Sequence, residues 1–519
     1  MMVKRFFSCC FQNYIEASDT DLYREFISKL QREDQRPTAL KEIKNLFGFK
    51  PPGHAASTIR NVGISKIVHC LNGPDKIQVD LACDVLKVCF DQMNTGDMIK
   101  HYTGHLMYLL RHEKDCVRRL AIDEVYKTVT TEPALLPVPD FIDVFVATAQ
   151  LIMDKDMGVA NRAIVITSNL PTEAYPKVLE EIKIALEDTS SVKCNAFEVI
   201  INISTKSYEL FKLSVDMNYV DFMVSELQSD DVLYQLNVLE LLSRLVVTPH
   251  GINYLIKKGT LENIATLLKD LSTNPLGNIL TPGYIKFFGC IAHHYPKEIF
   301  DKYPVLLDKL YDAFQCEDPT VLPVALDTLG FIGETIEGKL CLAALGAKYT
   351  QAVEHIGNII RNSATEMKVR ALHCFASLIS IDKDPKKPNT GPVDHRVTLM
   401  TREWFRSLNT TPSAMETLFG MCKNPFPDIR LGAFTLLDSV CQHQWGEELV
   451  ARTAGFIEYL LDRSVDHMKA SKEAKYDIVK RLANSPAFDD ALIKRLQTYV
   501  EQGPFYTETQ MEVAMEEGE

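Results

Sequence analysis

The sequence of 519 residues has none of the short motifs that usually mark a catalytic or cofactor site. It contains no P-loop, no GxGxxG dinucleotide turn and no GxSxG nucleophile elbow. Its cysteines and histidines show no recognised catalytic spacing. The sequence therefore predicts a protein that is not an enzyme, with no catalytic residues, no cofactor and no metal.

Positive charge, long apolar runs and paired cysteines are also scarce. The 56 Lys and Arg residues face 69 Asp and Glu residues, giving a net charge of −13, which disfavours a nucleic-acid partner. No apolar run approaches the roughly 18 residues that cross a bilayer, and the apolar part of the opening MMVKRFFSCCFQNY is too short for a signal peptide or an anchor. The 13 scattered cysteines contain no CxxC and fit a reducing compartment. We expect no membrane partner, and a location in the cytoplasm, or in the cytoplasm and nucleus.

Two histidine-containing stretches remain as candidates for chemistry. The spacing of His101, His105 and His112 would align all three along one helix, where they could not converge on a metal that needs three or four ligands. The second stretch is TPGYIKFFGCIAHHYP (281–296), which brings a cysteine and two histidines within five residues. Neither stretch supplies a complete set of ligands, so we expect no metal at either.

The second stretch is better explained as one helix of a repeat. We expect Thr281 to cap the helix start and Pro296 to lie just beyond its end. At helical spacing one face is apolar and predicts a core face, comprising Tyr284, Phe288, Ile291 and Tyr295. Lys286, Cys290 and His293 point the other way.

Internal repetition indicates the fold. A phrase with an acidic or turn residue, an apolar residue and then a small residue recurs about every 40 residues, as in 115–121, 156–163 and 428–433. Segment 231–259 aligns with 318–346 at a constant offset of 87, with leucine stripes typical of helices and glycines that we expect to end them. Such a period predicts an all-α solenoid of HEAT/armadillo-like repeats, in which each helix pair buries its apolar face against its neighbours.

We predict one solenoid over residues 1–503, with its N-terminal part to about residue 110 the least clearly patterned. Residues 382–396, rich in proline and charge, predict an exposed inserted loop, and the acidic residues 504–519 predict a disordered tail. Alternating charges in 455–486 predict a solvated terminal helix pair that caps the solenoid. Basic residues recur at the start of the second helix of several repeats, which favours an intramolecular ladder with acidic neighbours over partner contacts: Arg118, Lys193, Lys368, Arg370 and Arg430.

Several long phrases resemble the proteasome non-ATPase regulatory subunit 5 family. They are PGYIKFFG (282–289), DPTVLPVALDTLGFIGETIEGK (318–339), GFIEYLLDRSVDHMKASKEAKYDIVKRLANS (455–485) and QGPFY (502–506). The resemblance extends over roughly residues 220–510 and is weak before about residue 110. It implies a solenoid chaperone that is absent from the finished proteasome and assists assembly of the base of the regulatory particle.

The resemblance also implies partners. Members of this family hold the C-terminal domain of the first ATPase subunit of the ring, in a module joined by a second ATPase subunit and the large non-ATPase scaffold subunit, and they can restrain premature docking on the core particle. A generic armadillo/HEAT adaptor for other proteins is the alternative. We expect the free chain to be monomeric. Helix phase alone nominates five contact residues for a protein partner: Tyr234, Lys286, His293, Arg370 and Arg430.

Overall fold

The computed structural model describes most of the chain, namely residues 19–131, 138–271, 276–316, 319–381, 394–409 and 411–507. All regular secondary structure in these ranges is helical. The all-α prediction is therefore confirmed. The chain forms two compact units, residues 1–241 and 242–519, with the division inside helix α15 (Val232–Leu245). Each unit is described by itself.

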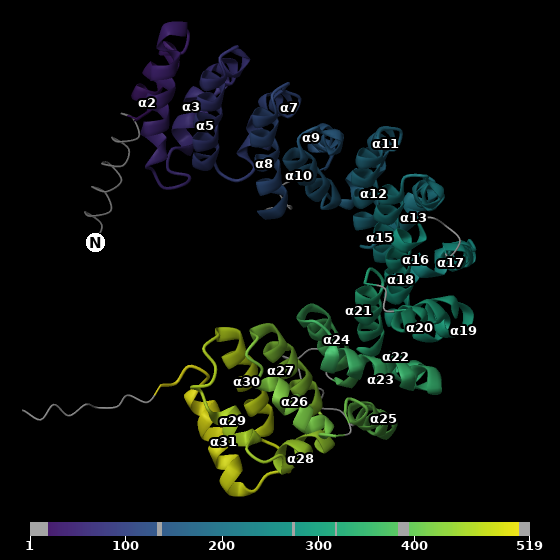
Figure 1. Ribbon diagram of the computed structural model, residues 1–519. Helices are drawn as coiled ribbons and strands as arrows, with labels where there is room; N and C mark the ends of the chain where they lie inside the picture. Colours follow the sequence, from purple (N-terminus) through teal and green to yellow (C-terminus); the bar gives the residue numbers. More distant parts are fainter. Residues whose placement is uncertain are drawn as a thin grey trace, which may run out of the picture. The chain divides into compact units, whose positions relative to one another are not determined.

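In the N-terminal unit, one row of helices is formed by consecutive neighbours that pack side by side (Figure 1). Its members are α2 (Arg36–Gly48), α5 (Lys76–Gln92), α8 (Asp115–Thr131), α10 (Met157–Ser168) and α12 (Ser190–Ser204). Residues 19–29 are also helical, and further α-helices of the unit are α3 (Ala56–Val62), α4 (Ser65–His69), α6 (Asp97–His101), α7 (Thr103–Leu110), α9 (Val138–Gln150), α11 (Tyr175–Ala185), α13 (Tyr208–Asp216) and α14 (Tyr219–Ser225). Helices α7, α9 and α11 form a second row that packs behind the first.

The C-terminal unit repeats this arrangement. Its row, here called the groove row, consists of α18 (Gly277–His294), α21 (Leu322–Gly333), α24 (Thr365–Ile379), α27 (Pro427–Cys441) and α30 (Lys469–Leu482). The remaining helices are α16 (Pro249–Lys257), α17 (Thr260–Asp270), α19 (Pro296–Lys302), α20 (Val305–Cys316), α22 (Ile336–Ala344), α23 (Ala347–Asn362), α25 (His395–Arg406), α26 (Ala414–Cys422), α28 (Gln444–Arg452), α29 (Phe456–Leu461) and α31 (Asp490–Gln502).

In some repeats the acidic residue of the repeat phrase acts as a helix cap. The Asp75 side chain accepts a hydrogen bond from the Ile77 amide at 3.0 Å at the start of α5, and Asp156 accepts one from the Val159 amide at 3.0 Å at the start of α10. Such a cap satisfies an amide that the helix itself leaves unpaired. The apolar stripes that follow each cap then form the core.

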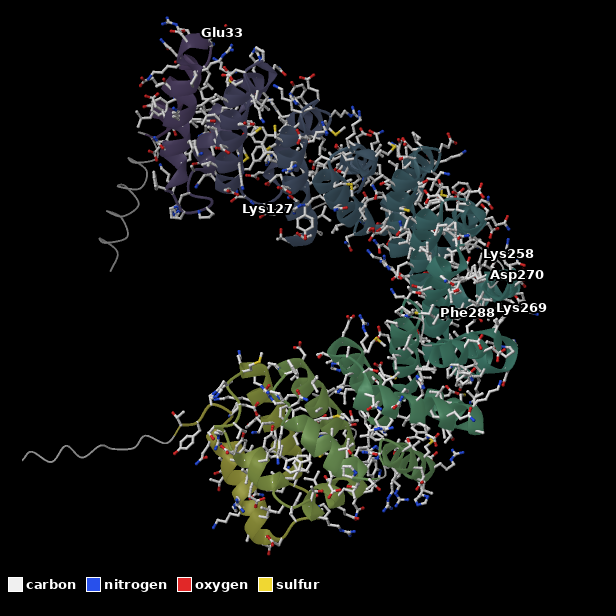
Figure 2. The ribbon with its side chains drawn as sticks, in the orientation of Figure 1. Glu33, Lys127, Lys258, Lys269, Asp270 and Phe288 are labelled. Atoms are coloured by element: carbon white, nitrogen blue, oxygen red, sulfur yellow. The ribbon has the colours of Figure 1, made fainter. Side chains whose placement is uncertain are left out.

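The predicted leucine stripes are buried. Leu326, Leu329 and Ile332 of α21 are at most 1% exposed, as are the matching leucines of α15. Burying each such side chain contributes roughly 1.5–3 kcal/mol. Figure 2 shows how apolar and charged side chains are separated in this region. Phe288 lies within the helical layers, whereas Lys258 and Lys269 lie at the solvent side.

The glycines of the two aligned segments have two different roles. Gly259 and Gly346 follow helices with φ of +69° and +61°, as expected for residues that end a helix. The prediction is wrong for Gly251 and Gly338, which lie in the first turns of α16 and α22.

The reason for glycine at these first turns is a close backbone approach. A Cβ atom on Gly338 would lie 2.0 Å from the carbonyl oxygen of Ile332, at the end of the preceding row helix. The Gly338 amide also donates to the Thr335 hydroxyl at 3.0 Å. Gly251 repeats the arrangement, with its Cβ position 2.3 Å from the Leu245 carbonyl oxygen.

Two predicted segments lie largely outside the described residues. Of the inserted loop predicted at 382–396, only 394–396 are described, and α25 already begins at His395. Of the acidic tail predicted at 504–519, only 504–507 are described, and they form turns and irregular structure.

Candidate protein-binding groove

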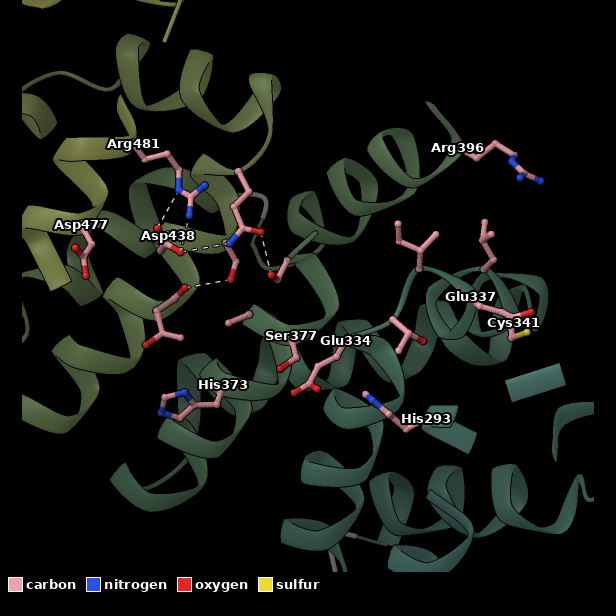
Figure 3. Close-up of a pocket in the computed structure, with 18 of the residues that line it drawn as sticks. His293, Glu334, Glu337, Cys341, His373, Ser377, Arg396, Asp438, Asp477 and Arg481 are labelled. Atoms are coloured by element: carbon pink, nitrogen blue, oxygen red, sulfur yellow. Dashed lines mark hydrogen bonds and ion pairs between the residues drawn. The ribbon is translucent and has the colours of Figure 1, made fainter. Parts of the chain in front are cut away.

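Side chains from several helices line a groove in the C-terminal unit (Figure 3). Its volume is about 1970 Å³, and its walls come from α18, α24, α27 and α30 of the groove row, from residues 334–335 after α21, and from α19, α22 and the start of α25. Because the apolar faces of these helices are turned into the core, their polar faces are left to line the groove.

Opposite charges line the groove in equal numbers. The four carboxylates and four cations are Glu334, Glu337, Asp438, Asp477, Lys297, Arg396, Lys480 and Arg481. Lys297 and Glu337 form an ion pair at 2.6 Å. The groove therefore carries many charged groups, with apolar side chains such as Leu340 and Phe434 between them, and neither sign of charge dominates.

A hydrogen-bond network fixes the wall between α24 and α27. The Arg481 Nε atom lies 3.1 Å from Asp438 Oδ1, and the Gln442 amide donates to Asp438 Oδ2 at 3.3 Å. The carbonyl oxygen of the Gln442 side chain accepts from the Ser380 hydroxyl at 2.9 Å and from the Ile381 amide at 2.7 Å. Each polar group here has a partner, so this wall is organised before any ligand binds.

Beside this network lies a second carboxylate. Partial desolvation of the carboxylate, and then the charge of Asp438, raise the pKa of Asp477. The opposing effect of Lys480 is smaller. Asp477 projects from α30 and is solvent-exposed, which makes it available to a positively charged side chain of a partner.

Three histidines also line the groove. The His293 ring stacks on Phe331, with centroids 3.8 Å apart and planes 4° apart, and its Nδ1 atom lies 2.6 Å from the Phe331 carbonyl oxygen. Burial lowers the pKa of His294, with a smaller contribution from His293, and burial also lowers the pKa of His373. The lowered values favour neutral imidazoles for these two residues at neutral pH.

The helix that carries two of these histidines begins earlier than expected. Helix α18 starts at Gly277, so the Thr281 hydroxyl bonds back to the Gly277 carbonyl oxygen at 2.7 Å and does not cap the helix. Pro282 is accommodated inside the helix. The end was predicted correctly, because α18 stops at His294 and Pro296 opens α19.

The core face predicted for this helix is largely present. Tyr284, Phe288 and Ile291 are at most 1% exposed, whereas Tyr295 is half-buried. The Cys290 thiol donates to the Ser243 carbonyl oxygen at 3.4 Å.

The other histidine stretch does not form one helix. His101 ends α6, His105 lies within α7, and His112 follows α7 and is buried. A break at Tyr102 separates the two helices, so the expected alignment along one helix is wrong. In the parts of the chain that the structure describes, no three His, Cys, Asp or Glu side chains are arranged to hold a metal ion.

The five nominated contact residues do not share one surface. His293 lines the groove, and Lys286 is exposed on α18. Tyr234 is only 3% exposed, so its ring cannot meet a partner without repacking. Arg370 and Arg430 are tied into ion pairs within the chain. Their role in binding stays a prediction.

The intramolecular ladder is present at four of its five predicted positions. Each pair joins neighbouring repeats: Arg118 to Asp154 at 2.5 Å, Lys193 to Glu226 at 3.2 Å, Arg370 to Asp327 at 2.7 Å, and Arg430 to Asp466 at 2.8 Å. Lys368 instead donates to the Arg361 carbonyl oxygen at 3.3 Å. These ion pairs within the chain explain most of the recurring basic residues, so no binding partner is needed to explain them.

The terminal helix pair is less solvated than its charges suggest. Asp466 and Lys475 are each 1% exposed and lie 3.3 Å apart, and Arg430 pairs with the same carboxylate. The Lys475 ammonium also donates to the Asp462 carbonyl oxygen at 2.7 Å. The prediction of a solvated face is wrong for Asp466 and Lys475, because charge alternation in a sequence does not reveal which charges are buried together.

Sequence reasoning also missed a buried lysine behind the groove. Lys339 is fully buried, and its ammonium group donates to the carbonyl oxygens of Ser377, at 2.7 Å, and Gly333. Burial lowers the pKa of Lys339 to about 7. The groove residues Glu334, His373, Asp438 and Asp477 were missed too; only their place on the polar faces of repeat helices could have suggested them.

The arrangement defines an α-solenoid of HEAT-like repeats with a groove lined by charges of both signs. Solved structures share this fold: importin beta aligns with a TM-score of 0.54 at 11% identity, covering 96% of this chain and 66% of that one, and yeast importin-beta with 0.55 at 12%, covering 95% and 66%. No helix in the described ranges combines the length and apolarity needed to span a membrane.

The chain belongs to the family described as proteasome non-ATPase 26S subunit, whose model matches residues 20–519. Three relatives carry the name 26S proteasome non-ATPase regulatory subunit 5. The human protein is 28% identical over 492 residues, covering 92% of this chain and 96% of the relative. The mouse protein is 27% identical, covering 96% and 99%, and the Drosophila melanogaster protein is 26% identical, covering 85% and 86%. The relatives are thus regulatory subunits, matched along nearly their whole length.

Proposed function

We propose that this protein is a chaperone for assembly of the base of the 26S proteasome regulatory particle. It binds the C-terminal domain of one proteasomal ATPase subunit, the first of the ring, and leaves before the mature proteasome forms. The observation that carries the proposal is the family match over residues 20–519. In this role the chain acts by binding and performs no catalysis.

The groove of the C-terminal unit suits reversible binding. A chaperone must release its client, and a polar interface releases more readily than an apolar one of the size found in permanent complexes. Several groove charges are already paired within the chain, so binding exchanges partners and buries few unpaired charges. Free carboxylates such as Asp477 and Glu334 then supply selectivity for basic side chains of the client.

We further propose that the complex of this chain with the ATPase subunit contains other proteins. A second ATPase subunit and the large non-ATPase scaffold subunit join the complex, and bound chaperone restrains premature docking on the core particle. We propose that this takes place in the cytoplasm, or in the cytoplasm and nucleus, with the free chain monomeric.

A binding panel tests the proposal. The full chain is immobilised and offered the six isolated C-terminal domains of the proteasomal ATPases separately, at low salt. One domain should be retained at least tenfold more strongly than the others, which corresponds to about 1.4 kcal/mol. Equal retention of all six, or retention of none, would contradict the proposal.

The place of the groove is tested with matched charge reversals. Asp477→Lys and Glu334→Lys should each weaken retention of the preferred domain about tenfold, because each sets a cation against the basic side chain it should attract. Glu354→Lys, on the exposed side of α23, is the control and should change retention less than twofold. Equal effects of all three changes would show that net charge, and not the groove, controls binding.

A further inference from the structure

An exposed apolar patch lies at one edge of the last repeats. Five large apolar side chains are exposed there: Phe426 by 60%, Val465 by 45%, Met468 by 47%, Phe505 by 52% and Tyr506 by 41%. They come from three segments that precede α27, precede α30 and follow α31. Scattered single apolar residues are ordinary on a protein surface, but a gathered set of this kind marks a binding site.

Contacts beneath the patch bring the first two segments together. Arg430, in the first turn of α27, pairs with the buried carboxylate of Asp466 at 2.8 Å. Val465 is the neighbour of Asp466 in the chain, and Phe426 lies one turn before Arg430. The buried pair therefore fixes these two side chains on the same edge of the unit.

A second arginine attaches the third segment. The Arg463 guanidinium donates to the Gly503 carbonyl oxygen at 3.1 and 3.2 Å and lies 5.5 Å from the Tyr506 ring centre. It also lies 3.8 Å from the ring centre of Tyr499, which is buried. The patch is thus held in place by charged groups on residues adjacent to its exposed members.

The surroundings of the patch are slightly basic within an acidic chain. Apart from the ion-paired residues Arg430, Asp466 and Lys475, segments 423–430 and 462–475 together carry four basic and three acidic residues, whereas the whole chain has a net charge of −13. Lys469 is 77% exposed and is only loosely paired, at 3.7 Å, with Glu473. An occupant of this patch should therefore combine apolar side chains with negative charge.

The residues that follow Thr507 have this composition. Segment 508–519, ETQMEVAMEEGE, contains five glutamates and no basic residue, and it also carries Met511, Val513 and Met515. It leaves the described chain directly beside Tyr506, and 12 residues can span up to about 40 Å. Tethering gives such a segment an effective concentration near the millimolar range at the patch, so weak contacts suffice.

We propose that residues 508–519 bind in cis to the apolar patch formed by Phe426, Val465, Met468, Phe505 and Tyr506. The methionine side chains contact the apolar surface, and the glutamates face the lysines at its rim. In the free chain the patch is then occupied by the tail. This proposal is independent of the client bound by the groove.

Competition between the tethered tail and a free copy of it tests the proposal. A labelled peptide of residues 508–519 is titrated with the full chain and with a full-length variant whose own tail is disabled by Met511→Ser, Met515→Ser, Glu516→Lys and Glu517→Lys. Fluorescence anisotropy should show binding to the disabled variant at least tenfold tighter than to the unaltered chain, because only the unaltered chain carries a competing tail.

Patch variants, made in the tail-disabled background, locate the site. Met468→Asp and Lys472→Glu should each weaken peptide binding about tenfold. The matched controls are Leu399→Asp, at an apolar residue 50% exposed on α25, and Lys494→Glu, on the exposed side of α31; neither should change binding more than twofold. Unchanged circular dichroism confirms that the variants are folded.

Three results would overturn the proposal. The first is no peptide binding to the tail-disabled chain at millimolar concentration. The second is equal binding to both full-length chains, which would leave the patch open to a different protein. The third is concentration-dependent dimerisation of the unaltered chain that the tail changes abolish, which would place the tail on a second copy.

Discussion

The C-terminal unit buries two lysines in different ways. Lys339 is surrounded by carbonyl oxygens and has no carboxylate partner, so burial lowers its pKa to about 7. Burial lowers the pKa of Lys475 as well, but the neighbouring carboxylate of Asp466 opposes that effect at 3.3 Å. At the first site the lowered pKa favours the neutral amine of Lys339. At the second site a buried carboxylate balances the charge of the Lys475 ammonium. Removing a partner should therefore have very different costs at the two sites.

The largest effect is expected at the paired site. Asp466→Asn leaves the buried ammonium of Lys475 and the guanidinium of Arg430 without their shared carboxylate. Breaking a buried ion pair in this way costs about 3–5 kcal/mol. Urea denaturation should show that loss in the free energy of unfolding. The control Asp428→Asn, at an exposed residue of α27, should cost less than about 1 kcal/mol. A similarly small cost for Asp466→Asn would contradict the conclusion that Lys475 depends on a buried counter-charge.

A smaller effect is expected at the unpaired site. Lys339→Met keeps most of the side-chain volume but leaves the Ser377 and Gly333 carbonyl oxygens without a donor, at a cost of about 1–3 kcal/mol. Urea denaturation at pH 7 measures this loss in the free energy of unfolding. A loss as large as that of Asp466→Asn would mean that Lys339 relies on a charge partner after all.

The pH dependence of stability separates the two lysines further. The Lys339 pKa is about 7 in the folded chain and 10.5 in an unperturbed lysine, so between these values the unfolded chain binds more protons than the folded chain. Its contribution to the free energy of unfolding therefore rises with pH across this window. The stability difference between the unaltered chain and Lys339→Met should widen from pH 7 to pH 9. A difference that is constant or narrows would contradict the lowered pKa.

The smallest effect is expected where a pair is exposed. Arg370 and Asp327 lie 2.7 Å apart, with side chains 38% and 56% exposed. Exposed pairs contribute about 0–1 kcal/mol, so Arg370→Glu should change the free energy of unfolding by no more than about 1 kcal/mol. If this substitution weakens client binding while the melting temperature is retained, Arg370 contributes to the interface.

The helical periodicity of the sequence was sufficient to predict the fold, because apolar stripes such as Leu326, Leu329 and Ile332 record directly which face is buried. Helix starts were harder: Thr281 has the residue type of a cap, but the preceding residues Gly277–Leu280 continue the helix toward the N-terminus. Periodicity could not reveal charge burial either. Lys475 looks like its solvated neighbours in the sequence, and only tertiary packing places it against Asp466.

The candidate site was predictable only in outline. His293 was nominated from its position on the polar face of α18, and it does line the groove. The other groove residues lie between His294 and Asn484, and no local spacing in the sequence indicates that Glu334 and Asp477 line the same groove. Tyr234 is buried in the free chain, which periodicity did not indicate, and its role in binding stays a prediction.

The glycines in the first turns of α16 and α22 have a mechanical consequence. At Gly338 the backbone of one helix rests against the last carbonyl groups of the helix before it, and Gly446 in α28 meets the Val440 carbonyl oxygen in the same way. Such backbone contacts cannot relax by changing a rotamer, as side-chain contacts can. The turns between these pairs of helices are therefore rigid. Any flexing of the C-terminal unit must therefore come from sliding between side chains of neighbouring groove-row helices.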